Sequence, residues 1–424
     1  MKGLKDCLIR SRYWKIMFWL ALTVWFVSCL DRSASFGETV DDQQFRVAFL
    51  GDLSGPVGFW NAPRLVGIQD AIEYMNGKLG GIGGRKVKLD WRDHQSNVAM
   101  AERYYKELRA YGDLIWHTCG TGEQQMLKLF YEQDRSQIIF TCSTSPGVMY
   151  PTGHVFGTAP YYPDQFGAFI DWLLEIWDEK AMQRKPRVAL MTYESGYGKA
   201  CISDEALEYA RKRGVQIVDT IFIPFVTTDA VGLLHRAKDA GADWLFGQWL
   251  WQTVPPYLKA NKEHSLGLKF CVNSFGVDQV MISSGLEAAE GLTGVTSWYL
   301  PHENTPGVNL VKEVLAERSR RDEDRGASYF LGWMNMWQTK MVVEETLSRV
   351  GTWDKLTPEE IMLTLENWHD VDVYGLGRVN YSRSERGARI MRIVQVKDGK
   401  WVPVTDWRKA PDLTPPEWNK PCHP

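Results

Sequence analysis

The sequence predicts an α/β fold made of two units, each with a mostly parallel sheet. From residue 45 onward, strand-like apolar runs alternate with amphipathic segments of helical length. The alternation begins again after "TAPYYPDQ" (158–165), which predicts a second unit of similar plan. Strands that alternate with helices are joined by right-handed crossovers, and such crossovers build parallel sheets. A chain of 424 residues, 44% of them hydrophobic, is long enough to bury two cores.

The first unit begins with the apolar run "FRVAFLG" (45–51), which we expect to be a buried strand. A helix is expected at 65–77, where apolar residues recur three or four positions apart. In "VKLDWRD" (87–93), apolar and charged residues alternate, as in a half-buried strand. The same patterns predict the other elements of this unit: a helix at 97–110, a strand at 114–117, a helix at 123–134 and a strand at 136–140.

The second unit begins with a helix expected at 165–178 and the strand-like run "RVALMT" (187–192). Its other predicted elements are a helix at 199–213, a strand at 215–223, a helix at 229–240, a strand at 243–247, one further helix and a strand at 268–273. Helices near 308–320, 328–349 and 357–367 follow, and then antiparallel strands at 377–381, 389–399 and 400–405. A proline-rich tail is assigned to 406–424, and its segment "KAPDLTPPEWNKPCHP" (409–424) is expected to lack regular structure.

Residues 1–29 are typical of a secretory signal, because a basic segment precedes an apolar stretch (16–27) that is too short to span a membrane comfortably. Two cleavage sites compete. "FVSC" resembles a bacterial lipobox ending in a lipid-bearing Cys29, whereas "SAS" (33–35) would give a mature start at Phe36. We favour the lipobox, since the apolar core ends directly before Cys29. Both sites predict a bacterial extracytoplasmic protein, periplasmic or membrane-anchored.

The charge of the chain argues against a nucleic-acid partner. The net charge is −3, and residues 1–29 carry +4 of it, so the remaining chain carries −7. Proteins that bind nucleic acid need a basic surface. An acidic chain without a cluster of basic residues does not indicate one.

The cysteines predict neither a disulfide framework nor a zinc site. Beyond the signal there are five, an odd number without a CxxC pair. Cys119 and Cys142 each follow a predicted strand and would lie near each other if those strands were neighbours. We expect them to be two buried free thiols.

The motifs of common enzymes are missing from the sequence. Gly198-Lys199 lacks the glycine and the hydroxyl of a phosphate-binding loop, and "GGIGGRK" (80–86) follows a helix, which is the wrong order for a dinucleotide fingerprint. Neither a GxSxG elbow nor an HExxH pair occurs. We therefore predict no catalysis, no cofactor and no metal site.

Small polar residues follow three predicted strands of the first unit. The segments are "GDLSGPVGFW" (51–60), "HTCGTGEQ" (117–124) and "TCSTSPG" (141–147). In open α/β sheets, ligands bind beyond the carboxyl ends of the strands, where backbone N–H groups at helix starts point at the ligand. The sequence therefore predicts a ligand site at these three strand ends.

With these loops, the sequence resembles the leucine/isoleucine/valine-binding family of type I periplasmic binding proteins, the extracytoplasmic receptors of ABC importers. The resemblance covers about 45–405. Four segments carry it: "LSGPVGFWNAPRLVGIQDAIEYMN" (53–76), "GGIGGRKVKLDWRD" (80–93), "YESGYGKA" (193–200) and "VQVKDGKWVPV" (394–404).

The resemblance implies two doubly wound, Rossmann-like lobes that are joined by hinge strands and close around a ligand. It implies that lobe 1 comprises 45–159 and 298–350, and lobe 2 comprises 160–297 and 351–405. It also implies a monomer that delivers a small molecule to an ABC permease and ATPase encoded elsewhere.

Carried over residue by residue, the resemblance implies a ligand site with a polar cradle and aromatic walls. The cradle comprises Gly120, Thr121, Ser143, Thr144 and Ser145, and the walls comprise Trp60, Tyr197, Trp249, Trp251 and Phe275. Helix capping by the hydroxyls and core packing of Trp249 and Trp251 are the structural alternatives.

Two positions depart from the family pattern. Gly120 stands where the family usually has a hydroxyl, and Phe275 stands where amino-acid binders keep an acid for the ligand's ammonium. Burying an ammonium without a partner is costly. The sequence therefore predicts an aromatic or apolar carboxylate, or an amide, unless Asp278 or Glu194 supplies the acid. A branched-chain amino acid receptor and a ligand sensor for a signalling partner are the alternatives.

Overall fold

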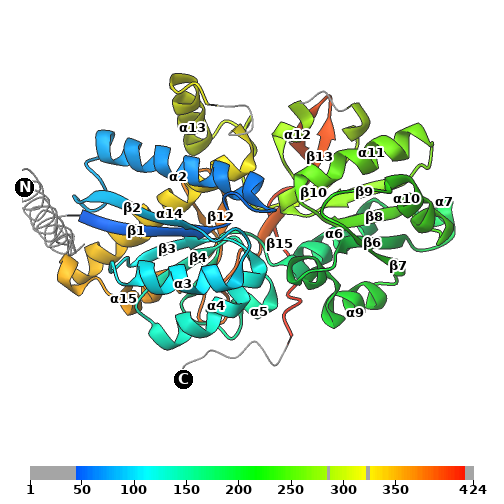
Figure 1. Cartoon of the computed structure of the whole chain (residues 1–424). Helices are drawn as coiled ribbons and strands as arrows, with labels where there is room; N and C mark the ends of the chain where they lie inside the picture. Colours follow the sequence, from blue (N-terminus) through cyan, green and yellow to red (C-terminus); the bar gives the residue numbers. More distant parts are fainter. Residues whose placement is uncertain (1–43, 284–286, 321–324, 416–424) are drawn as a thin grey trace, which may run out of the picture. The chain divides into compact units, whose positions relative to one another are not determined.

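The computed structural model describes residues 44–283, 287–320 and 325–415, so the predicted signal segment, Cys29 and the end of the proline-rich tail lie outside the described residues. Within these ranges, two sheets of mainly parallel strands are each covered by helices (Figure 1). The predicted α/β fold with two doubly wound lobes is confirmed.

The first lobe is built on a five-stranded parallel sheet with the order β2-β1-β3-β4-β5. Its elements are β1 (Gln44–Gly51), α2 (Gly58–Lys78), β2 (Lys86–Asp93), α3 (Val98–Arg109), β3 (Ile115–Thr118), α4 (Thr121–Asp134), β4 (Ile138–Thr141), α5 (Pro146–Met149), β5 (Val155–Gly157), α14 (Ala327–Val350) and α15 (Pro358–Leu365).

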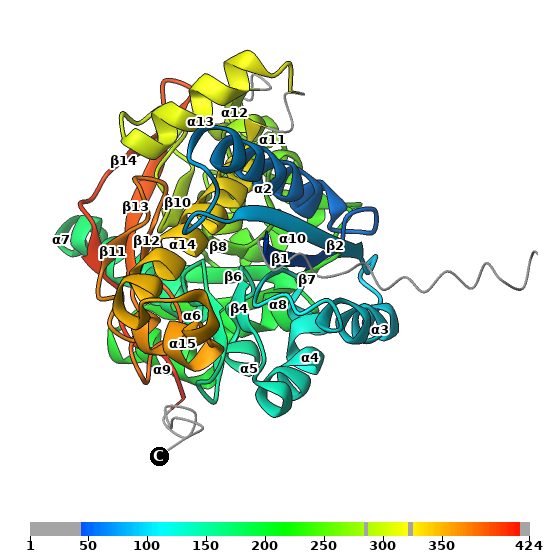
Figure 2. The ribbon, with the colours of Figure 1, turned by 90° about the vertical axis from the view of Figure 1, so that its left-hand side faces the viewer.

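Both faces of this sheet are buried, which explains why β1 is apolar without interruption from Val47 to Leu50. Val47 and Phe49 belong to the same hydrophobic cluster as the buried residues of α2 and α14. Ala48 and Leu50, which alternate with them, belong to the cluster formed with α3 and α4. Figure 2 shows α2 and α14 on one face and α3 and α4 on the other.

Helices α2 and α14 approach each other closely through two glycines. A Cβ on Gly67 would lie 2.3 Å from the carbonyl oxygen of Tyr329, and a Cβ on Gly332 would lie 2.3 Å from that of Arg64. The contact requires residues without a side chain at both positions. It holds the first turns of α2, which carry Trp60 and Asn61, against the start of α14.

The second lobe is built on a sheet with the order β14-β13-β10-β9-β8-β6-β7, in which β6 to β10 are parallel and β13 and β14 are antiparallel. Its elements include α6 (Tyr162–Ile176), α7 (Glu179–Met182), β6 (Arg187–Tyr193), α8 (Gly196–Lys199), α9 (Asp204–Lys212), β7 (Gln216–Ile223), α10 (Ala230–Asp239), β8 (Trp244–Gln248), α11 (Val254–Glu263), β9 (Lys269–Val272), α12 (Gln279–Ser283), β10 (Thr293–Thr296), β13 (Ile390–Lys397), β14 (Lys400–Pro403) and β15 (Arg408–Lys409).

The segments that join the two sheets pair with one another. Pro160 forms a bridge with Ala388, and Trp298 forms one with Gly377. Nearby are helix α13 (Pro306–Glu317) and the small ladder of β11 (Val371–Asp372) and β12 (Arg378–Val379). The predicted lobe boundaries remain a prediction. In the structure, the segment 351–405, which was predicted to belong to lobe 2, contributes to both lobes. Its helix α15 packs on α14 and β4 of the first lobe, whereas β13 and β14 belong to the sheet of the second lobe.

Two helices differ from the sequence prediction. Helix α2 begins at Gly58 rather than at 65, so Trp60 and Asn61 lie on its first turns. The helix predicted at 199–213 is interrupted, because Ser203 caps a new helix by accepting the backbone N–H of Ala206. Among the described residues, no helix is long and apolar enough to cross a membrane.

Candidate ligand-binding site

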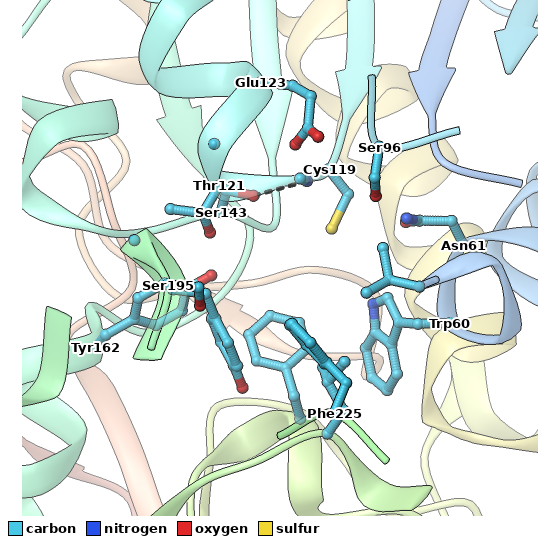
Figure 3. A pocket seen from close by; sticks show the side chains of 17 residues that line it. Trp60, Asn61, Ser96, Cys119, Thr121, Glu123, Ser143, Tyr162, Ser195 and Phe225 are labelled. Atoms are coloured by element: carbon cyan, nitrogen blue, oxygen red, sulfur yellow. Dashed lines mark hydrogen bonds between the residues drawn. The ribbon is translucent and has the colours of Figure 1, made fainter. Parts of the chain in front are cut away.

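A cavity of about 250 Å³ lies between the two lobes, at the carboxyl ends of their strands. Figure 3 shows side chains converging on it from both lobes. The lining residues from the first lobe are Val57, Trp60, Asn61, Ser96, Cys119, Gly120, Thr121, Gly122, Glu123 and Ser143. The others are Tyr162, Ser195, Gly196, Tyr197, Phe225, Leu250 and Phe275.

The polar side of the cavity is the beginning of helix α4. Gly120 is the N-cap, and the three residues after it form the first turn and also line the cavity. The first backbone N–H groups of a helix have no partner within the helix, and the helix dipole places positive charge there. Ser143 extends this side, since its Oγ accepts the backbone N–H of Gly120 at 3.0 Å. These groups can hold a carboxylate without a cationic side chain.

Gly120 has a backbone conformation that excludes larger residues. Its φ is 119°, and a Cβ placed on it would lie 2.6 Å from Oε2 of Glu123. A hydroxyl-bearing residue at this position would be strained in this loop. The departure from the family pattern at Gly120 therefore follows from the local backbone.

The opposite side of the cavity is an aromatic wall centred on Phe275, which is 2% exposed. Its ring meets those of Trp60 and Tyr197 in edge-to-face contacts, with centroids 5.0 and 5.8 Å apart. Tyr162 lies edge-on to Tyr197 at 5.1 Å. Such contacts bury apolar surface and leave ring faces and edges to receive a small apolar group.

Glu123 is the only Asp or Glu that lines the cavity in the part of the chain that the structure describes, and no Lys, Arg or His lines it there. Burial raises the pKa of Tyr162 to about 12, so this phenol is neutral at physiological pH. Arg64 lies behind the cavity, where its Nη1 donates to the carbonyl oxygen of Thr118 at 2.9 Å. Burial lowers the pKa of Arg64 to about 9, which leaves the guanidinium charged at neutral pH.

Six of the ten predicted site residues line the cavity: Trp60, Gly120, Thr121, Ser143, Tyr197 and Phe275. They come from α2, from the ends of β3 and β4, from α8 and from the short 3-10 turn (Ser274–Gly276) after β9. Their role in ligand binding stays a prediction.

Two of the predicted hydroxyls do not line the cavity and have partners in the protein. The Oγ1 of Thr144 donates to the carbonyl oxygen of Pro160 at 2.6 Å. Ser145 precedes α5, and its Oγ accepts from the side-chain amide of Gln125 at 3.3 Å. Both side chains are buried, so they order the loop behind Ser143.

The two predicted tryptophan walls also lie off the cavity. Trp249 is fully buried, with its indole stacked on Tyr257 at a centroid distance of 5.0 Å. Its backbone carbonyl accepts the hydroxyl of Tyr197, which does line the cavity, at 3.2 Å. Trp251 contacts Phe59 of the first lobe edge-to-face at 5.9 Å. Trp249 is therefore part of the core, which was the structural alternative considered from the sequence. Trp251 forms a contact between the lobes.

The sequence reasoning missed several residues that line the cavity. The most informative are Asn61, Ser96, Glu123, Tyr162, Ser195 and Phe225. Asn61 and Glu123 follow predicted site residues by one or two positions, so the strand-end argument could have included them. Ser195 lies two positions before Tyr197 in "YESGYGKA" (193–200), a segment that already carried the resemblance. Phe225 follows β7, where the next residues are Pro, Phe and Val rather than small polar residues.

Cys119 and Cys142 form a disulfide, which corrects the expectation of two free thiols. Strands β3 and β4 are neighbours with Thr118 opposite Thr141, so the next residues in both strands lie side by side with Cα atoms 5.3 Å apart. Cys201 and Cys271 are free and buried. Among the described residues, no group of three or more His, Cys, Asp or Glu side chains could hold a metal ion.

Neither acid proposed from the sequence as a substitute ammonium partner reaches the cavity. Glu194 lies on the surface, 3.5 Å from the ammonium of Lys199. Asp278 is buried elsewhere, and its two oxygens accept the backbone N–H groups of Val280 and Ala327 at 2.7 and 2.8 Å. It therefore joins a loop of the second lobe to the start of α14.

Asp278 is expected to make stability depend on pH. Burial raises its pKa to about 6 in the folded protein, so between pH 4 and 6 the folded state holds a proton that the unfolded state has lost. The contribution of Asp278 to the free energy of unfolding is therefore greatest below pH 4. It decreases by roughly 2–3 kcal/mol as the pH rises to 6. Urea unfolding of the wild type and of Asp278→Asn at pH 4.5 and pH 7 measures this change in the free energy of unfolding. If the free energy of unfolding depends on pH equally in both proteins, Asp278 is not the cause.

Two doubly wound lobes with a cavity at the facing strand ends define a protein of the class that binds a small solute between two lobes. A family model described as periplasmic binding protein matches residues 44–400. The chain belongs to the periplasmic binding protein family, type I, of the leucine/isoleucine/valine-binding kind. Proteins of this family are the extracytoplasmic substrate-binding components of bacterial ABC transporters.

Individual relatives agree with this assignment. The chain is 27% identical over 294 residues to the Leu/Ile/Val/Thr-binding protein of Salmonella typhimurium, covering 67% of this chain and 76% of that protein. A branched-chain amino acid ABC transporter protein from Thermus thermophilus with bound valine has a TM-score of 0.77 at 23% identity, covering 87% and 97% of the two chains. A solute-binding protein from Rhodopseudomonas palustris HaA2 in complex with p-hydroxybenzoic acid has a TM-score of 0.70 at 16% identity, covering 87% and 98%. Two of these three proteins are named as binding proteins.

Proposed function

We propose that this protein captures a small aromatic or apolar carboxylate, or the corresponding amide, for import by an ABC permease and ATPase. Export by the N-terminal signal, with Cys29 as a lipid tether, is part of the proposal. One observation carries the ligand class. By the family resemblance, Phe275 stands where amino-acid binders keep an acid for the ligand's ammonium, and its ring packs instead against those of Trp60 and Tyr197.

The cavity offers a carboxylate or amide one polar end. The first turn of α4 presents backbone N–H groups, and Thr121 and Ser143 add hydroxyls. The rest of a small ligand would lie between the rings of Trp60, Tyr162 and Tyr197. A mostly apolar cavity with a few polar groups at one end is typical of small-molecule sites.

The comparisons and the disulfide support this reading. The structural relative from Rhodopseudomonas palustris was solved with p-hydroxybenzoic acid, an aromatic carboxylate, in the same fold. A disulfide between Cys119 and Cys142 suits the oxidising periplasm.

We also propose that ligand binding shifts the lobes toward the closed arrangement. The ligand would contact Thr121 and Ser143 of the first lobe together with Tyr197 of the second. The edge-to-face contact of Phe59 with Trp251 between the lobes would add to the closed state.

The proposal is tested by titrating the purified protein, after unfolding and refolding to release retained ligand, with benzoate, benzamide and valine. We expect benzoate or benzamide to raise the melting temperature and to give a calorimetric binding isotherm, because a ligand that binds only the folded state stabilises it. We expect no such effect from valine. Binding of valine without binding of either aromatic compound would overturn the proposal.

A branched-chain amino acid is the second candidate, and Glu123 is the observation that favours it. Its carboxylate lines the cavity and is 7% exposed, so it could pair with an ammonium from the first lobe instead of the second. If valine binds, Glu123→Gln is expected to weaken binding at least about 10-fold, because an ammonium would lose its charged partner. If the ligand is a carboxylate, the same change removes a repulsive charge and is expected to strengthen binding.

A further inference from the structure

Asn61 is a buried polar side chain that the proposed carboxylate site does not use. It is fully buried and lines the cavity, yet neither its Oδ1 nor its Nδ2 hydrogen-bonds to another protein group. Burying an unpaired amide costs about 1–3 kcal/mol. A group in the cavity that pairs with this amide would offset that cost.

Two further polar atoms lie beside Asn61. The indole Nε1 of Trp60, the preceding residue, is buried and has no protein acceptor. Ser96 also lines the cavity, and because its Oγ donates to Oδ2 of Asp52 at 2.6 Å, its oxygen is left to accept. Together, Trp60, Asn61 and Ser96 offer donors and acceptors within one part of the cavity.

This part of the cavity is separate from the beginning of α4. In Figure 3, Trp60, Asn61 and Ser96 project from one side, whereas Thr121 and Ser143 project from the other. The side-chain amide of Asn61 is directed into the space between them. A ligand held at α4 by its carboxylate would therefore extend toward Asn61.

We propose that Asn61 selects ligands with a second polar group, a hydroxyl that both donates and accepts, remote from the carboxylate. The hydroxyl would donate to Oδ1 of Asn61 or to Ser96, and accept from Nδ2 of Asn61 or from Nε1 of Trp60. The substrate class is then a small hydroxylated aromatic acid rather than an unsubstituted one. This inference rests on the proposed function and deepens it.

The test compares benzoate, 3-hydroxybenzoate and 4-hydroxybenzoate by calorimetry with the wild type, Asn61→Leu and Asn61→Ala. The wild type is expected to bind at least one hydroxylated acid about 10-fold more tightly than benzoate. The reason is that benzoate would leave the buried polar groups beside Asn61 without partners. In Asn61→Leu this preference is expected to fall to about 2-fold, with benzoate affinity nearly unchanged, because only the hydroxyl loses its partner.

Asn61→Ala only removes atoms, so it keeps the test available if leucine disturbs the packing of α2. Asn309→Leu, the same substitution at an exposed position of α13, is the matched control and is expected to keep the full preference. A wild type that prefers benzoate, or Asn61 variants that keep the preference, would overturn the inference while leaving the proposed function in place. A wild type that binds neither the three acids nor benzamide would overturn both.

Discussion

Removal of the disulfide between Cys119 and Cys142 is expected to lower the free energy of unfolding by about 3 kcal/mol, the value for a closed loop of this length. The two cysteines are separated by 23 positions in the sequence. Cys119 lines the cavity, and the bond joins the ends of β3 and β4, from which Thr121 and Ser143 extend. We therefore expect ligand affinity to fall as well, because the two loops would no longer be held together.

Urea unfolding and calorimetry of the double variant Cys119→Ser/Cys142→Ser, beside the wild type with and without reductant, measure both effects. Reductant on the double variant is the control, since Cys201 and Cys271 are already free thiols. Reduced wild type should match the double variant. If reductant changes neither the stability nor the affinity of the wild type, the two loops do not depend on this bond.

Gly120→Ala is expected to weaken ligand binding more than about 10-fold and to destabilise the protein by roughly 1–3 kcal/mol. The φ of Gly120 is 119°, and the added Cβ would lie 2.6 Å from Oε2 of Glu123. Relief of this contact would move the Glu123 carboxylate or rotate the start of α4. Either movement would displace the backbone N–H groups that hold the ligand in the proposed site.

Gly122→Ala is the matched control for stability, two positions further along the same helix. A Cβ on Gly122 meets no atom within 4 Å. Alanine is the better helix former, so this change is expected to be neutral or to stabilise by up to about 1 kcal/mol. Thermal unfolding and calorimetry of both variants check the pair. If Gly120→Ala and Gly122→Ala have equal melting temperatures and equal ligand affinities, then a side chain at position 120 does not strain the backbone.

The alternation of strands and helices could be predicted from sequence because it depends on local patterns. The run 45–51 and the charged alternation at 87–93 became β1 and β2 with nearly the expected ends. Part of the lining of the cavity could be predicted for a similar reason. In a parallel sheet all carboxyl ends meet at one edge, so strand ends followed by small polar residues, such as Thr121 and Ser143, converge without knowledge of the strand order.

Which neighbours a side chain meets depends on packing between distant segments, and here the sequence was insufficient. Trp249 and Trp60 carry the same indole, yet Trp249 stacks on Tyr257 in the core while Trp60 lines the cavity. Thr144 and Ser143 are adjacent hydroxyls, but Thr144 turns away to bond the carbonyl of Pro160. Neither difference has a local signal.

The sequence by itself determined the α/β class, the two lobes and the strand ends that line the cavity, because periodicity and turn residues act over a few positions. Only the tertiary structure decided that Cys119 pairs with Cys142, because the pairing requires β3 and β4 to be neighbours in register. It also decided that the amide of Asn61 is buried without a protein partner beside the cavity. Burial and hydrogen bonding of this kind depend on groups that are far apart in the chain.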